Sequence, residues 1–93
     1  MELLSKVDDT GSVKAACKEM YMSYAKARRL IALAESELGF RLTEPRRGGA
    51  ARGGTTLTEK GKEYLRNCII IQKEVQDYCE ELYERHFQKS DDV

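Results

Sequence analysis

The chain of 93 residues is long enough for one domain with one core and too short for two. Its composition, 41% hydrophobic and 34% charged, excludes a disordered chain, and its apolar runs, such as Cys68 to Ile71, are far too short to cross a membrane. The net charge is zero but unevenly spread. Residues 1–58 hold ten Lys and Arg against seven Asp and Glu (net +3), and residues 59–93 hold six against nine (net −3). A basic half of this kind can meet nucleic-acid phosphate while the acidic half stays away from it.

Three short helices are predicted in the first part of the chain. The first covers residues 2–9 and ends at Gly11, because glycine readily takes the left-handed conformation that follows a helix. Ser12 and Ser23 precede the second and third helices, where a hydroxyl can cap the first turn, and Gly39 ends the third. Two helices separated by a tight turn form a helix-turn-helix unit. The apolar positions expected to face the core are Leu3, Leu4, Val7, Val13, Ala16, Cys17, Met20, Ala27, Leu30, Ile31, Ala34 and Leu38.

A β-hairpin is predicted after the third helix. The alternation in Phe40–Thr43 indicates one short strand, and Thr55–Leu57 can return as the second. The intervening Pro45–Gly54 contains one Pro and four Gly in ten residues, which excludes regular structure there. A hairpin that follows a helix-turn-helix is a wing.

One long helix is predicted from Thr58, which can cap it, to Phe87. The expected fold is therefore mainly α with a small β-hairpin wing: a winged helix-turn-helix domain over residues 1–58, a dimerisation helix over 59–87 and a polar tail over 88–93. Apolar residues in the long helix are spaced alternately by four and three, the pattern of a coiled-coil seam. The seam, which predicts a homodimer, consists of Tyr64, Cys68, Ile71, Val75, Tyr78 and Leu82.

Polar and basic residues gather on the third helix, on the face opposite its apolar stripe. The DNA major groove admits an α-helix, and residues near the start of the second helix of this motif usually contact base edges. Arg28 or Arg29 can pair with guanine, small Ala25 permits close approach, and Tyr24 can reach phosphate or a thymine methyl group. Arginines in the glycine-rich hairpin can follow phosphate or enter a narrow minor groove. The predicted DNA-contacting residues are Ser23, Tyr24, Ala25, Lys26, Arg28, Arg29, Arg46, Arg47 and Arg52.

The sequence contains few residues in a pattern typical of a catalytic site. His86 is the one histidine, and no motif places a nucleophile beside it. Cys17, Cys68 and Cys79 lack metal-ligand spacing and are expected to be reduced and metal-free, as in the cytoplasm. We therefore expect neither an enzyme nor a bound cofactor.

Short motifs in a specific order resemble known regulators. They are TGS at 10–12, the alanine pair at 15–16, MSY at 22–24, and two glycine pairs before LTxxG at 57–61. The run resembles the DNA-binding domain of LysR-type regulators and, more closely, molybdate-responsive regulators of the ModE family. The resemblance implies a winged helix-turn-helix with the Ser23–Leu38 helix in the major groove and the last helix forming a dimer. ModE-like sensors carry a separate β-rich domain for the oxyanion, so tight molybdate binding is not expected of this chain.

Two functions fit these features. The first is a sequence-specific DNA-binding transcriptional regulator that acts as a homodimer on double-stranded DNA. The alternative is a winged-helix protein-interaction or dimerisation module that does not bind DNA, which the zero net charge keeps open.

Overall fold

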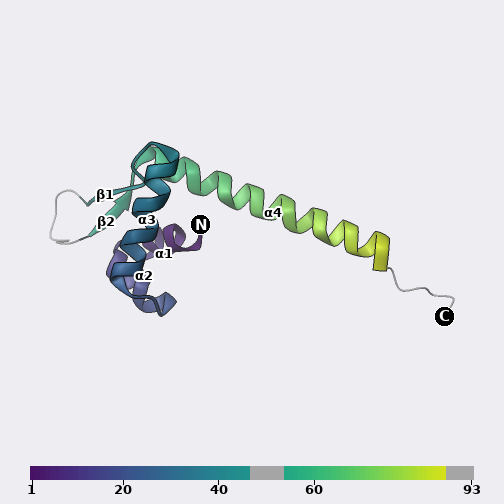
Figure 1. The fold of residues 1–93 in the computed structure, drawn as a ribbon, viewed down its shortest axis with the longest axis horizontal. Coiled ribbons are helices and arrows are strands. Elements are labelled where there is room, and N and C mark those ends of the chain that lie inside the picture. The colour runs from purple at the N-terminus through teal and green to yellow at the C-terminus, as the bar shows by residue number, and fades with distance from the viewer. Residues whose placement is uncertain (47–53, 88–93) are drawn as a thin grey trace.

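The computed structural model describes residues 1–46 and 54–87. A globular part is built from three short helices and a two-stranded antiparallel hairpin, and the last helix projects from it as a long arm (Figure 1). This arm accounts for the elongated dimensions of 64 × 27 × 23 Å. The elements are α1 (Glu2–Thr10), α2 (Val13–Met20), α3 (Tyr24–Leu38), β1 (Thr43–Pro45), β2 (Thr55–Leu57) and α4 (Glu59–Phe87).

The predicted caps fix the helix boundaries. The hydroxyl of Ser12 accepts a hydrogen bond from the Ala15 amide at 3.1 Å, and that of Ser23 accepts one from the Lys26 amide at 3.1 Å. At the other ends of α1 and α3, Gly11 and Gly39 have φ of 75° and 81°, the left-handed conformation that favours glycine. The helix-turn-helix is therefore confirmed, with its boundaries set by local sequence.

Side chains of α1, α2, α3, β2 and the start of α4, together with Leu42 just before β1, form one core. Leu4, Val7 and Leu42 have its largest fully buried side chains. Leu65 is the contribution of α4, so only the start of this helix is anchored in the globular part. The buried apolar set is Leu3, Leu4, Val7, Val13, Ala16, Cys17, Ala27, Ile31, Leu42, Leu57 and Leu65.

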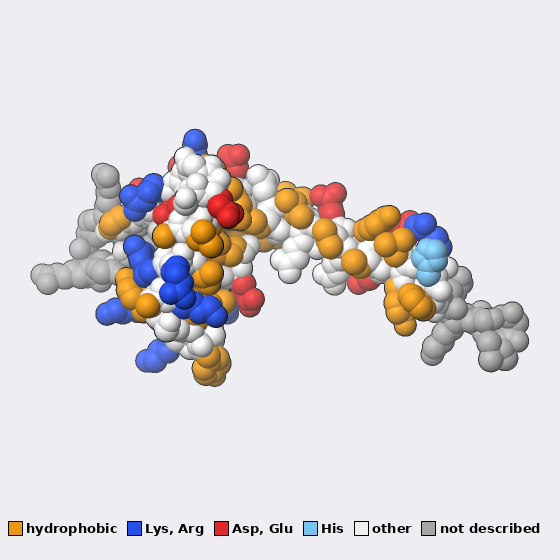
Figure 2. All heavy atoms as spheres, in the orientation of Figure 1, with side chains coloured by type: hydrophobic (Ala, Val, Ile, Leu, Met, Phe, Trp, Pro, Cys, Tyr) orange, Lys and Arg blue, Asp and Glu red, His pale blue; other side chains and the backbone are white. Residues whose placement is uncertain are grey.

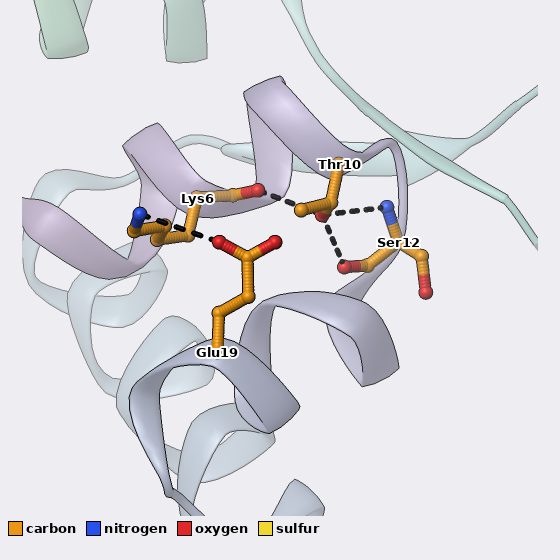
Figure 3. A network of polar contacts seen from close by, with 4 residues as sticks. All are labelled: Lys6, Thr10, Ser12 and Glu19. Carbon is orange, nitrogen blue, oxygen red and sulfur yellow. Dashed lines mark hydrogen bonds and ion pairs between the residues drawn. The ribbon is translucent and has the colours of Figure 1, made fainter.

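Polar contacts join α1 to α2 beside this core (Figure 3). The ammonium of Lys6 lies 3.4 Å from a carboxylate oxygen of Glu19, and the Thr10 hydroxyl donates to the Lys6 carbonyl at 2.7 Å. The same hydroxyl lies 3.0 Å from the Ser12 carbonyl oxygen. Thr10 therefore links the last turn of α1 to the residue that caps α2.

The first strand begins later than predicted. The prediction placed it at Phe40–Thr43, but β1 covers Thr43–Pro45 and pairs with β2 through Thr43↔Leu57 and Pro45↔Thr55. The physical reason is that a carboxylate of α3, Glu35, accepts the Leu42 amide at 2.7 Å, so this amide is not available to a strand. Pro45, predicted to lie outside regular structure, ends β1, where an edge strand tolerates a residue without an amide hydrogen.

The apolar stripe of α3 is narrower than predicted. Ala27 and Ile31 are buried and Ala34 packs against the core, but Leu30 and Leu38 are each 36% exposed. These two leucines were predicted to face the core. The core of the globular part covers only the line through Ala27, Ile31 and Ala34, and Leu30 and Leu38 lie at its margin.

The arm formed by α4 leaves half of the six predicted seam residues in solvent. Ile71, Val75 and Tyr78 are each more than half exposed. Nearer the globular part, Tyr64 and Cys68 are half-buried, and a hydrogen bond with Cys68 together with burial raises the pKa of the Tyr64 hydroxyl. Pairing of this seam with a second copy stays a prediction.

Candidate nucleic-acid interface

The first two turns of α3 present a polar face to solvent. Ala27 and Ile31 fix the opposite side of the helix in the core, and the Ser23 cap fixes where it begins. With the helix held in this way, its predicted contact residues are all exposed, including Tyr24 at 48%. The structure thus brings together one set of predicted site residues, Ser23, Tyr24, Ala25, Lys26, Arg28 and Arg29.

Positive charge on this face is not neutralised by the described part of the chain. In residues 1–46 and 54–87, no carboxylate forms an ion pair with Lys26, Arg28 or Arg29. Figure 2 shows Lys and Arg side chains gathered over the globular part where α3 faces the viewer, whereas hydrophobic side chains continue along α4. These three cations are available to an anionic partner such as phosphate.

A hollow of about 150 Å³ separates α3 from the hairpin. Arg28 lines it from α3 and Arg41 from the segment that precedes β1. Arg28 thus lies on the hairpin side of α3. The remaining lining comes from the two strands and their ends: Thr43, Glu44, Pro45, Gly54 and Thr55. Two guanidinium groups at one hollow suit an anionic strand that passes between helix and wing.

The hairpin is held to α3 and α4 through the backbone around Leu42. The carboxylate of Glu35 in α3 accepts the amides of Leu42 and Thr43 at 2.7 and 3.4 Å. From the other side, the Thr58 amide donates to the Leu42 carbonyl at 3.0 Å, and its hydroxyl donates to the Arg41 carbonyl at 2.6 Å. A β-carbon at Gly61 would collide with the Leu42 carbonyl, so glycine is needed where α4 crosses this segment. These contacts fix the angle between recognition helix and wing.

A second anchor joins the hairpin to the turn between α1 and α2. The Thr55 amide donates to the Gly11 carbonyl at 2.8 Å. The Arg46 guanidinium lies against the Gly11 backbone, where a β-carbon would overlap it. The sequence identified Gly11 only as a helix stop and Arg46 only as a DNA contact. Their proximity places the Arg46 side chain against the turn between α1 and α2.

Two exposed residues were absent from the predicted contact set. Tyr21, in the turn that precedes α3, is 98% exposed. Its backbone φ is 53°, a left-handed conformation that residues other than glycine rarely adopt. Arg41 was not in that set either, and it lines the hollow. Exposure of a large aromatic residue is a tertiary property, so periodicity could not identify Tyr21. Of the predicted wing residues, Arg47 and Arg52 lie outside the described residues.

Neither a metal centre nor a membrane helix is found in the described part of the chain. No group of three or more His, Cys, Asp or Glu side chains there could hold a metal ion. Among the described helices, none is both long and apolar enough to span a bilayer.

A helix-turn-helix followed by a hairpin, with an exposed basic face on the second helix of the motif, defines a winged helix-turn-helix domain. A family model described as "Bacterial regulatory helix-turn-helix protein, lysR family" matches residues 1–62. The chain belongs to the lysR family of bacterial regulatory helix-turn-helix proteins.

Related proteins agree with this assignment. The chain is 34% identical over 83 residues to the HTH-type transcriptional activator AaeR of Escherichia coli K12 and to the quorum-sensing regulator A of E. coli O6:H1. These matches cover 89% of the chain but 25% of each relative, so the chain spans about a quarter of their length.

Its fold is similar to the DNA-binding domain of CbnR in a DNA complex (TM-score 0.74, 21% identity, 90% of this chain and 91% of that one). It also matches full-length CbnR with its target DNA (TM-score 0.73, 22% identity, 89% and 27%). The sequence resemblance to LysR-type regulators is confirmed. Its closer attribution to molybdate-responsive ModE regulators is not supported, because the relatives are LysR regulators.

Proposed function

We propose that the chain is the DNA-binding part of a sequence-specific transcriptional regulator and is not an enzyme. The observation that carries this proposal is the exposed face of α3, where Lys26, Arg28 and Arg29 have no carboxylate partner in the described residues. The hollow between α3 and the hairpin lies beside this face. Membership of the lysR family supports the same function.

In this proposal α3 and the hairpin make different kinds of contact with DNA. Side chains on α3 enter the major groove, where Arg29 reads a base edge and Lys26 reaches base or phosphate. Arg28 and Arg41, at the hollow, contact the backbone of the strand that passes between helix and wing. Arginines of the hairpin, Arg46 with Arg47 and Arg52, add contacts to phosphate or groove shape.

We further propose that α4 pairs with α4 of a second copy in antiparallel orientation. Residues 59–73 carry four Lys and Arg against two Glu, and residues 74–87 carry one Arg against five Asp and Glu. An antiparallel pair sets the half with net charge +2 against the half with net charge −4, whereas a parallel pair sets like charges together. Pairing also covers Ile71, Val75 and Tyr78, which are more than half exposed in a single copy. A protein that reads DNA in this way acts in the bacterial cytoplasm.

Binding of the chain to random-sequence duplex DNA across a salt series tests the proposal. Each phosphate contact should lower the logarithm of the affinity by about 0.9 per tenfold rise in salt. We expect a slope of several such units for the whole chain. Binding that is absent at low salt, or independent of salt, would favour the protein-interaction module.

A further inference from the structure

Cys68 and Cys79 lie on one face of α4. They are eleven residues apart, which is three turns of 3.6 residues plus about 20°, so both project to the same flank of the helix. Cys68 is the seam residue at this edge, and Cys79 lies beside the line through Ile71 and Val75. Cys68 is half-buried and Cys79 is exposed, and both thiols are free.

The two thiols of one copy cannot meet. At a rise of about 1.5 Å per residue their Cα atoms are roughly 16 Å apart along the helix axis. A disulfide requires Cα atoms about 4.4–6.8 Å apart. Any disulfide between Cys68 and Cys79 in the folded chain therefore joins two copies.

The antiparallel pairing proposed above brings these thiols together. The midpoint of the predicted seam, which runs from Tyr64 to Leu82, lies at position 73, and a two-fold axis placed there relates the two copies symmetrically. The midpoint between Cys68 and Cys79 is 73.5, within half a residue of the same place. A two-fold axis perpendicular to both helices reverses their direction but keeps each side chain on the same flank of the pair. Cys68 of one copy therefore faces Cys79 of the partner subunit. With helices about 8–10 Å apart, their β-carbons come within about 5 Å of each other.

We infer that Cys68 and Cys79 of the partner subunit form a thiol pair, present twice in the dimer, that peroxide converts into a disulfide. This inference rests on the proposed homodimer. Two copies of one link, related by the two-fold axis, would fasten the arms together and fix the separation of the two reading helices.

Hydrogen peroxide is the oxidant that converts the two thiols into the disulfide. The more exposed thiolate, Cys79, attacks one peroxide oxygen, the O–O bond breaks, and after proton transfer a sulfenic acid and one water form. The thiolate of Cys68 on the other copy then attacks the sulfenic sulfur, which forms the S–S bond and releases the second water. Each link consumes two thiols and one peroxide. In a reducing cytoplasm the link reverts by thiol exchange, so it forms only during oxidation.

The test oxidises the full chain with hydrogen peroxide at a concentration where sedimentation shows a dimer, followed by non-reducing electrophoresis and mass spectrometry of tryptic peptides. We expect a covalent dimer that dithiothreitol reverses, with Cys68 joined to Cys79 as the dominant peptide pair. Cys68→Ser and Cys79→Ser should each abolish this pair. Cys17→Ser, whose thiol is buried in the globular core, is the matched control and should leave it unchanged.

The possible results distinguish a failure of the thiol pair from a failure of the proposed dimer. A dimer that yields no cross-link, or chiefly like-to-like links (Cys68 to Cys68 or Cys79 to Cys79), overturns the thiol pair while dimerisation stands. A chain that sediments as monomer overturns both the dimer and the thiol pair. DNA binding, measured separately on the reduced protein, decides the regulator function independently of either result.

Discussion

Replacing Glu35 with alanine should loosen the junction between the recognition helix and the wing. The carboxylate accepts the Leu42 amide at 2.7 Å, whereas the bond to the Thr43 amide, at 3.4 Å, is long and contributes little. A hydrogen bond to a charged acceptor contributes about 1.5–3 kcal/mol, and the side chain is 20% exposed. We therefore expect a loss of about 1.5–2 kcal/mol in the free energy of unfolding. For a domain of this size that corresponds to a fall in Tm of roughly 6–16 °C.

Urea denaturation at one fixed protein concentration measures this loss, because the proposed dimerisation would make apparent stability depend on concentration. Glu37→Ala is the matched control: it removes an exposed carboxylate from the same helix and should change stability by less than about 0.5 kcal/mol. Glu35→Gln retains an oxygen acceptor without the charge and should lie between the two. If Glu35→Ala proved as stable as Glu37→Ala, the junction would not depend on this carboxylate.

Three further changes test other parts of the account. Gly61→Ala should destabilise the chain by about 1–3 kcal/mol, because its β-carbon meets the Leu42 carbonyl; urea denaturation indistinguishable from wild type would argue against that close approach. Changing Val75 and Leu82 together to Asp should yield a monomer by sedimentation, and an intact dimer would place the interface elsewhere. Arg29→Ala should cost on the order of 1–3 kcal/mol on the preferred site and little on random DNA, whereas Arg46→Ala should weaken binding to all sequences alike. Affinities measured on both DNAs would contradict this division if the two variants exchanged behaviours.

The helices were predictable because their signals are local. Ser12 and Ser23 cap the amides three residues ahead of them, and Gly11 and Gly39 adopt the left-handed conformation that follows a helix. Each signal lies within one turn of the boundary that it sets. The face of α3 followed from the same periodicity, since burial of one side of a helix exposes the other.

The placement of the hairpin could not be predicted in the same way. Glu35 reaches a backbone amide seven residues away, and this contact displaces β1 toward Pro45. Arg46 and Gly11 are brought together only by the tertiary fold. Such contacts leave no periodic signal in the sequence. They decide where the wing lies and therefore what the hollow beside Arg28 can bind.

Selection of bound duplexes from a random DNA pool tests the central claim most directly. The account predicts enrichment of an inverted repeat, because a two-fold dimer presents two copies of α3, with half-sites about one helical turn or a multiple of it apart. The same selection with Arg29→Ala should relax the preference at one position in each half-site. A pool that stays random although the chain binds DNA would contradict sequence-specific reading by α3.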